Sequence, residues 1–475
     1  MNTSALPLEL SCLGNRDRAR AVAARAAKTV PAYARHLAGA NVPPEPAEWD
    51  RLPPTDKKNY LLAHPFADLL ADDFADTFTI FSSSGSSGRP FYWPQLKEGS
   101  RESGARLRTL LEGVFRVHER RTLAIVGLAL GSWIGGEHFS WVLKSLAAEA
   151  PYPFAVFSPG NHHDEIIGMI ESAGRFVDQV VLFVCPSAIG HLRLRAEQQG
   201  RPLPLARLRF VVIGEPFPES VRLELQAQAG VAPEEPVMLS IFGSADTGVL
   251  GFESPASALV RGRCERDRGL AEQLGFGGVV PHLFHQADPG ALLENVEGEL
   301  CVTKWQGVPL VRYNLHDAVR LMNWRAIAER AGALCAGAQG LPDILAITGR
   351  ADSCLLLCGT NLTESMLDAA VRSPGLAAWL TGNYRARVTQ EGGRQRLEFT
   401  LECRAANVPP EEVAAAVYPL LVDALGRVQP EFKDDWQNIY RRWDDDPALR
   451  ILALKPVAWP ALAEDRRIKQ RGVRP

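Results

Sequence analysis

Apolar segments that alternate with helical stretches dominate the first half of the chain. The apolar segments span residues 122–126, 154–157, 180–184, 208–213 and 237–242. Helical stretches lie between most of them, at residues 137–149, 164–172, 188–198 and 218–229. Because this alternation requires crossover connections, it predicts a mostly parallel sheet with helices on both faces. Ligands bind such sheets in crevices at the carboxyl ends of the strands, where the polar loops of this chain also lie.

One polar loop has an unusual composition. A β-branched, apolar run at residues 77–81 leads directly into serines and glycines. The loop residues are Ser83, Ser84, Gly85, Ser86, Ser87, Gly88 and Arg89, followed by Pro90. Glycines allow close backbone approach, so consecutive N–H groups and hydroxyls could surround phosphate oxygens. The spacing is not that of a Walker A loop, and a flexible linker is the alternative interpretation.

Length and composition limit the classes of function. A chain of 475 residues predicts two or three domains, and a net charge of −3 gives no reason to expect nucleic acid or an anionic membrane as a partner. The first residues show no signal-peptide pattern, and no apolar run approaches the roughly 20 residues that span a bilayer. The eight cysteines form no CxxC pairs. We therefore expect a cytoplasmic, reduced protein. Cys354 and Cys358 are predicted to lie in a buried strand.

Other candidate site residues also follow strands. Gly131–Gly136 opens a helix and contains Trp133, which either forms an apolar wall for an aromatic substrate or belongs to the core. Glu215, after Gly214, either lies beside a ligand or serves as an ordinary charge at a helix N-terminus. His282 and His285 have a spacing found in metal sites, but no acid or cysteine cluster supports zinc, so we expect core or surface histidines.

Four motifs together resemble the adenylate-forming superfamily, which comprises acyl-CoA synthetases, adenylation domains and luciferases. They are the Ser/Gly loop at 83–90, Phe-Gly-Ser-Ala-Asp at 242–246, Gly-Glu-Leu at 298–300 with Pro-Leu-Val-Arg-Tyr-Asn-Leu-His-Asp at 309–317, and Gly-Arg-Ala-Asp at 349–352. The segments at 30–33 and 52–57 are similar to the opening of phenylacetate-CoA ligases. The resemblance covers nearly the whole chain, and the chain is similar to adenylating enzymes of phenazine antibiotic pathways.

The resemblance implies a two-domain α/β fold. Residues 1–350 would form a large ATP- and acid-binding domain of mixed and parallel sheets covered by helices, together with a small distorted barrel. Residues 351–475 would form a small mobile α/β lid domain. Asp352 would be the hinge residue, and antiparallel strands at 298–317 would close the large domain.

The resemblance also implies roles for individual residues. Ser83 to Arg89 would hold the ATP phosphates, although Arg89 stands where the family usually has Lys. Phe242, with Gly243, Ser244 and Ala245, would lie against adenine beside Gly214 and Glu215. Asp246 would hold Mg²⁺, and Asp317 and Arg350 would bind the ribose hydroxyls. Ala245 replaces the usual hydroxyl residue, Asp246 is shorter than the usual Glu, and His316 stands in place of the usual Gly.

The remaining implied residues concern the acid and its acceptor. Trp133, Ile134 and Gly135 would contact the acid, and Gly359 would line a thiol tunnel. Lys469 is the candidate catalytic lysine, with Lys455 as the alternative because the usual Ser-Gly-Lys context is missing.

We expect ATP-dependent conversion of a carboxylic acid, favoured to be aromatic, into an acyl-adenylate, as in secondary metabolism. The acyl group would pass to coenzyme A or to the phosphopantetheine of an acyl carrier protein. Two alternatives stay open: an amide ligase with an amine acceptor, and a catalytically degenerate member that binds an aryl acid or nucleotide. By family likeness the enzyme would form a homodimer.

Overall fold

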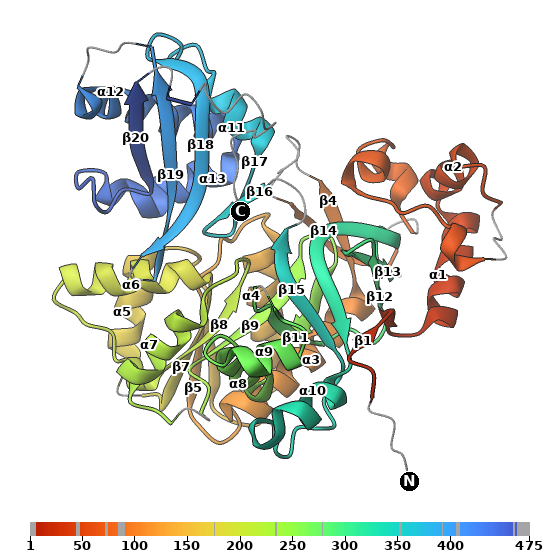
Figure 1. The fold of residues 1–475 in the computed structure, drawn as a ribbon. Helices are drawn as coiled ribbons and strands as arrows, with labels where there is room; N and C mark the ends of the chain where they lie inside the picture. The colour runs from red at the N-terminus through yellow and green to blue at the C-terminus, as the bar shows by residue number, and fades with distance from the viewer. Residues whose placement is uncertain are drawn as a thin grey trace.

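The computed structural model describes residues 6–43, 48–71, 75–83, 91–174, 176–232, 235–277, 279–350, 354–391, 393–404, 409–458 and 461–462. Figure 1 shows a large part with a central sheet covered by helices, and a smaller C-terminal part with its own sheet. Below, "large part" means residues 6–350 and "C-terminal part" means residues 354–462. The predicted mixed α/β fold is confirmed. No helix within the described ranges is long and apolar enough to cross a membrane.

The parallel half of the central sheet has the predicted alternation. Its strands are β5 (Thr122–Val126), β6 (Phe154–Phe157), β7 (Gln179–Val184), β8 (Leu208–Ile213) and β9 (Met238–Ser244), in the order β9-β8-β7-β5-β6. Alternate strand residues point to opposite faces, so Leu123 and Ile125 pack in one core and Ala124 and Val126 in the other. The first core is covered by α5 (His163–Ala173), α6 (Pro186–Gln198) and α7 (Glu219–Ala229), and the second by α3 (Lys97–Phe115) and α4 (Ile134–Glu149).

Antiparallel strands extend the same hydrogen-bonded sheet. They are β10 (Gly248–Phe252), β11 (His282–Gln286), β12 (Leu292–Val296), β13 (Glu299–Lys304), β14 (Leu310–Met322) and β15 (Ile344–Arg350), with the short strands β1 (Glu9–Leu10) and β2 (Cys12–Leu13) at the margin. The antiparallel pairing predicted for residues 298–317 is confirmed. These strands continue from β9 through β10, so they are hydrogen-bonded to the parallel half. Helices α8 (Pro255–Cys264), α9 (Arg268–Gln273) and α10 (Trp324–Ala331) pack alongside.

An N-terminal arm packs against the antiparallel strands. Helices α1 (Arg16–Thr29) and α2 (Pro31–Gly39) are separated at Pro31, because proline disfavours a continuous helix and is tolerated at the first position of a new one. Three short helical turns follow, η1 (Trp49–Arg51), η2 (Lys57–Leu61) and η3 (Phe66–Leu69), and then the hairpin of β3 (Thr77–Ser82) and β4 (Tyr92–Leu96). Thr55 pairs with β14, since its N–H donates to Arg312 O at 3.2 Å and its carbonyl accepts from Asn314 N at 2.7 Å. This pairing places η2 next to β14.

The C-terminal part has its own apolar core. A hairpin of β16 (Cys354–Leu357) and β17 (Thr360–Thr363) precedes a sheet of β18 (Leu380–Glu391), β19 (Arg394–Cys403) and β20 (Leu452–Ala458). Helices α11 (Glu364–Val371), α12 (Pro410–Val428) and α13 (Pro430–Asp435) pack on this sheet, followed by the turns η6 (Trp436–Tyr440) and η7 (Arg441–Trp443). Both strands and helices are present, as the α/β character implied by the resemblance requires. Cys358, which we had expected in a strand, lies in the turn between β16 and β17 and adopts a left-handed φ of 50°. The exact domain boundary at residues 350 and 351 stays a prediction, because residues 351–353 lie outside the described residues.

Candidate functional site

The turn between β9 and β10 carries the acidic residue of the candidate site. Phe242 stacks on Phe284, with ring centroids 5.4 Å apart. A side chain at Gly243 would meet Gly248 O at 2.3 Å, so only glycine fits there. Ser244 Oγ lies 3.0 Å from Thr247 Oγ1, and Ala245 packs against the core beneath. Contacts within the turn and with the core therefore fix its conformation and the position of Asp246.

Residues from other strands hold Asp246. Tyr313 of β14 donates a hydrogen bond from its hydroxyl to Asp246 Oδ2 at 2.6 Å, and Gln306 Nε2 donates to Asp246 O at 2.7 Å. Burial raises the pKa of the Asp246 carboxyl, while Lys57, Tyr313 and Arg350 act in the opposite direction. Two cations and one carboxylate thus share this place, an arrangement suited to a ligand that carries several negative charges.

Asp317 and Arg350 lie opposite each other on β14 and β15. They are partners in the antiparallel register, and Arg350 Nη1 lies 4.0 Å from Asp317 Oδ2. The Asp317 side chain is 14% exposed, and an ionised carboxylate can accept two O–H hydrogen bonds from one ligand. The structure brings this pair to the same place as Asp246, because Arg350 acts on the Asp246 carboxyl.

Lys57 is a site residue that the sequence analysis did not identify as functional. Burial lowers the pKa of its ammonium group, and Asp246 partly restores it. Its Nζ lies 3.5 Å from Ser83 Oγ, at the start of the Ser/Gly loop. Asp56 caps the turn η2 by accepting from the N–H groups of Lys58 and Asn59, which orients Lys57. The capping residue Asp56 is the signal in the sequence that could have indicated an ordered turn at Lys57. Its proximity to Asp246 could not be predicted, because it depends on the pairing of Thr55 with β14.

The candidate acid-binding residues lie at the N-terminal end of α4. Ser82 N donates to Ser132 O at 2.8 Å, which ties the end of β3 to the residues before the helix. Trp133 and Ile134 are partly buried, and nothing lies within 4 Å of a side chain placed at Gly135. Trp133, Ile134 and Gly135 therefore lie beside Ser83, with Gly135 facing open space.

Gly214, Glu215 and Gly359 form a second group. Register pairing of Ile213 with Ile241 sets Gly214 alongside Phe242, at the carboxyl ends of β8 and β9. Gly359, from the C-terminal part, approaches Gly214 closely, and Cys185 Sγ lies against both glycines. Glu215 is buried, and its Oε1 accepts from Ser187 N at 2.5 Å. The C-terminal part therefore reaches the same crevice as the large part.

Several predicted residues lie outside the described residues. They are Ser84, Gly85, Ser86, Ser87, Gly88, Arg89, Asp352 and Lys469. The alternative lysine, Lys455, is described, and its Nζ pairs with Glu398 Oε2 at 2.9 Å on the C-terminal sheet. Lys455 is therefore engaged within the C-terminal part.

His282 and His285, whose spacing is found in some metal sites, are core residues. His282 and His285 lie on β11, and burial lowers the pKa of both, that of His285 to about 4. His285 contacts Ser254 Oγ at 2.8 Å and Pro342 O at 2.7 Å. Of the two positions expected, core or surface, both histidines occupy the core.

The described residues hold no group of three or more His, Cys, Asp or Glu side chains arranged for a metal ion. Mg²⁺ needs few protein ligands when phosphate and water complete its shell. The single partly buried carboxylate of Asp246 fits that requirement.

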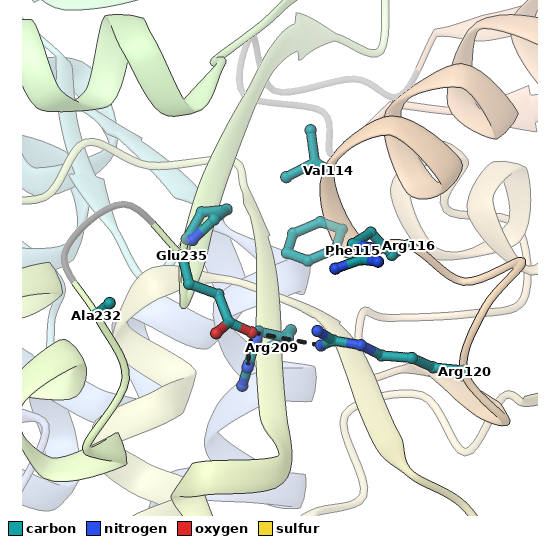
Figure 2. Close-up of a pocket in the computed structure, with 8 residues that line it drawn as sticks. Val114, Phe115, Arg116, Arg120, Arg209, Ala232 and Glu235 are labelled. Atoms are coloured by element: carbon teal, nitrogen blue, oxygen red, sulfur yellow. Dashed lines mark hydrogen bonds and ion pairs between the residues drawn. The ribbon is translucent and has the colours of Figure 1, made fainter. Parts of the chain in front are cut away.

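A surface cavity of about 360 Å³ lies elsewhere, between the end of α3 and the start of β8. Figure 2 shows the Glu235 carboxylate between two arginines that line it. Arg209 lies 2.5 Å and Arg120 3.3 Å from Glu235 Oε1, so these charges are already paired. The cavity is remote from Asp246, because it lies at the opposite ends of the parallel strands.

Comparison with protein-family models and with curated proteins finds no match. Among solved structures, a 2-hydroxyisobutyryl-CoA ligase in complex with 2-HIB-AMP and CoA matches with a TM-score of 0.60 and 16% identity, over 96% of this chain and 87% of that chain. The amide bond synthetase McbA from Marinactinospora thermotolerans matches with a TM-score of 0.45 and 12% identity, over 94% and 80%. The first likeness shows that this chain has the same overall fold as that CoA ligase. The second score is too low to add an argument.

Proposed function

We propose that this chain is an adenylate-forming ligase that activates a carboxylic acid with ATP. The proposal depends on one observation: Asp246, Asp317, Arg350 and Lys57 lie close together. They come from the β9–β10 turn, β14, β15 and the turn η2, and they lie beside Phe242 and the start of the Ser/Gly loop. This set combines acceptors for ribose hydroxyls, cations for phosphate oxygens and an aromatic ring for adenine. The sequence resemblance supports the same assignment for the loop from Ser83 to Arg89.

The proposed first step needs positioning more than acid–base chemistry. A carboxylate oxygen of the substrate attacks the α-phosphorus of ATP, the bond to the bridging oxygen breaks, and pyrophosphate leaves. Asp317 and Arg350 orient the ribose, and Lys57 balances charge on the phosphates. Mg²⁺, which Asp246 would hold with the nucleotide, supplies further neutralisation of the phosphate charge. Lys469 would bridge the substrate carboxylate and the phosphate.

In the proposed second step a thiol sulfur attacks the acyl carbonyl and AMP leaves. Coenzyme A or a carrier-protein phosphopantetheine would supply the thiol, with Gly359 beside its path. Residues 1–350 would bind ATP and acid, and residues 351–475 would act as the lid that excludes water from the mixed anhydride. Likeness to phenylacetate-CoA ligases and to adenylating enzymes of phenazine pathways, together with Trp133, favours an aromatic acid. An amine acceptor is the alternative.

The test is acid-dependent exchange of pyrophosphate into ATP, with Mg²⁺, across a panel of aromatic and aliphatic acids. We expect exchange with a small set of aromatic acids. Coenzyme A, a carrier protein or an amine is then added to identify the acceptor. Absence of exchange with every acid, in protein that still binds ATP, would replace the proposal with the degenerate nucleotide- or acid-binding member.

Two substitutions separate binding from chemistry. Asp317→Ala should weaken ATP binding by roughly ten-fold or more, because hydrogen bonds to a charged group contribute about 1.5–3 kcal/mol. Lys469→Ala should abolish exchange and leave ATP binding nearly intact. Lys455→Ala is the matched control and should retain exchange. The reverse pattern for the two lysines would assign the catalytic role to Lys455.

A further inference from the structure

Two side chains from the end of β13 hold the backbone of the turn that carries Asp246. Lys304, the last residue of β13, donates from its Nζ to Thr247 O at 3.0 Å, and Gln306 Nε2 donates to Asp246 O at 2.7 Å. Side chains two residues apart in an extended chain point to the same side, which explains why both reach the turn. Two consecutive carbonyl groups of the β9–β10 turn are therefore held from one neighbouring segment.

Trp305, between these two donors, fixes the segment from its other side. Its ring packs against the apolar core of the antiparallel half, and the Arg25 guanidinium of α1 lies 3.7 Å from the ring centroid. A cation over an aromatic face is an attractive contact. The segment at 304–306 is therefore anchored by the core and by the N-terminal arm, while its donors face the turn.

Asp288 holds the ammonium group of Lys304 in place. A lysine side chain is flexible, so a single bond to a carbonyl would not fix it. Asp288 is 3% exposed, and its Oδ2 lies 2.8 Å from Lys304 Nζ. Its Oδ1 accepts from Gly290 N at 3.0 Å and lies 3.4 Å from Arg106 Nη1 of α3. Because Asp288 is itself fixed by a backbone N–H and a second cation, the ammonium group stays between Asp288 and Thr247 O.

The alternative interpretation is that Lys304 only neutralises the buried charge of Asp288. Neutralisation requires neither the bond to Thr247 O nor the bond from the uncharged amide of Gln306 to Asp246 O. Both bonds reach peptide units that adjoin the Cα of Asp246 or follow the next residue, and these units set the direction of its side chain. The two contacts together therefore favour a role in placing the Asp246 carboxylate.

We propose that Lys304 and Gln306 are positioning residues that fix the turn at 245–248 and, through it, direct the Asp246 carboxylate toward the Mg²⁺ of Mg²⁺–ATP. Lys304, Gln306 and Asp288 are called the clamp below. The role of Asp246 in this inference rests on the proposed ligase function, whereas the contacts between the clamp and the turn do not depend on it.

Hydrogen exchange of the ligand-free protein tests whether the clamp fixes the turn. Gln306→Leu removes one donor without leaving a buried charge unpaired. Lys304→Met is combined with Asp288→Asn, because the single change would leave a buried carboxylate without its cation. Mass spectrometry follows exchange in peptides that cover residues 242–250. We expect exchange there to become about five-fold faster in either variant and to stay unchanged in residues 179–184 of β7, since opening of the turn is local.

Mg²⁺–ATP affinity tests whether the clamp acts through Asp246. Calorimetry compares the wild type, Gln306→Leu, Asp246→Asn and the variant with both changes. Gln306→Leu should weaken binding by roughly five-fold in the wild-type background and not at all in the Asp246→Asn background, because residues that act through one another are coupled in this way. The control is Gln228→Leu, which removes an exposed glutamine of α7 that bonds Glu224 Oε1 at 3.0 Å, and it should change neither measurement.

Three results would count against these assignments, and each has a different meaning. Unchanged exchange at residues 242–250 in both clamp variants would overturn the proposal that the clamp fixes the turn. Equal losses of affinity in the two backgrounds would overturn the positioning of Asp246 and leave a purely structural contact. Absence of Mg²⁺–ATP binding by the wild type would instead refute the proposed ligase function, and with it the role of Asp246, while the exchange measurement still decides whether the clamp fixes the turn.

Discussion

The Asp246 carboxyl lies among three polar neighbours that come from distant parts of the chain. Burial raises the pKa of its carboxyl, and Lys57, Tyr313 and Arg350 counter that effect. The ionised form attracts a cation and can accept hydrogen bonds, such as that from the Tyr313 hydroxyl, through both of its oxygens. The Lys57 and Arg350 cations therefore favour the ionised form of the carboxyl.

Substitution of Lys57 tests this balance. Lys57→Ala removes a cation that lowers the pKa of Asp246, so that pKa should rise and the acidic limb of any ATP-binding profile should move to higher pH. ATP affinity at neutral pH should fall by roughly ten-fold, because a charge-assisted contact to phosphate is lost. Titration calorimetry with Mg²⁺–ATP from pH 5 to 8 measures both effects.

The matched control is Lys58→Ala, which removes an exposed lysine from the same turn. It should leave affinity and pH profile unchanged. Equal losses in both variants would mean that the turn η2, rather than the Lys57 ammonium group, supports binding.

His316 shows how a departure from a family pattern can be accommodated. The residue adopts a left-handed φ of 59°, which explains why a glycine is usual at this position. Its Nδ1 lies 2.9 Å from Glu299 Oε2, and its N–H donates to Asn314 Oδ1 at 2.7 Å. These contacts offset the backbone cost and leave Asp317 in register with Arg350.

At the scale of elements, the β9–β10 hairpin depends on one glycine. A methyl group at Gly243 would lie 2.3 Å from Gly248 O and 3.0 Å from Val249 Cα, both backbone atoms that cannot move aside without opening the hairpin. Gly243→Ala should therefore destabilise the protein by about 1–3 kcal/mol. It should also displace Asp246 and weaken ATP binding. Thermal unfolding and calorimetry report the two effects.

Gly113→Ala is the control for that prediction. Gly113 lies in α3, and a methyl group there meets nothing within 4 Å. The substitution should stabilise the helix by about 0.5–1 kcal/mol, since alanine loses less conformational entropy. Stability of Gly243→Ala equal to the wild type would contradict the packing argument.

At the scale of the whole molecule, the two parts meet where α6 touches the tip of the β18–β19 hairpin. A methyl group at Gly190 would lie 2.8 Å from Gly393 backbone atoms, so Gly190→Ala should push the C-terminal part away. Labelling of Cys358 with N-ethylmaleimide should increase by about ten-fold relative to the wild type. Gly168→Ala in α5, where only an arginine side-chain end lies at 3.9 Å, should have no such effect.

The sequence by itself determined the elements and their order. The strands from β5 to β9, the break at Pro31 and the antiparallel run through residues 298–317 depend on local periodicity, turn residues and proline geometry, which a short window contains. Asp246, Asp317 and Gly359 were selected from the sequence as candidates, because each stands in a motif of the resemblance.

Only the tertiary structure decided which of these elements share a site. Lys57 reaches Asp246 because Thr55 pairs with β14, more than 250 residues away in sequence. Glu215 and Asp435 face the same turn because two separately packed parts meet there. Contacts of this kind depend on side-chain packing across the whole chain, and no local pattern encodes their distance or their effect on a pKa.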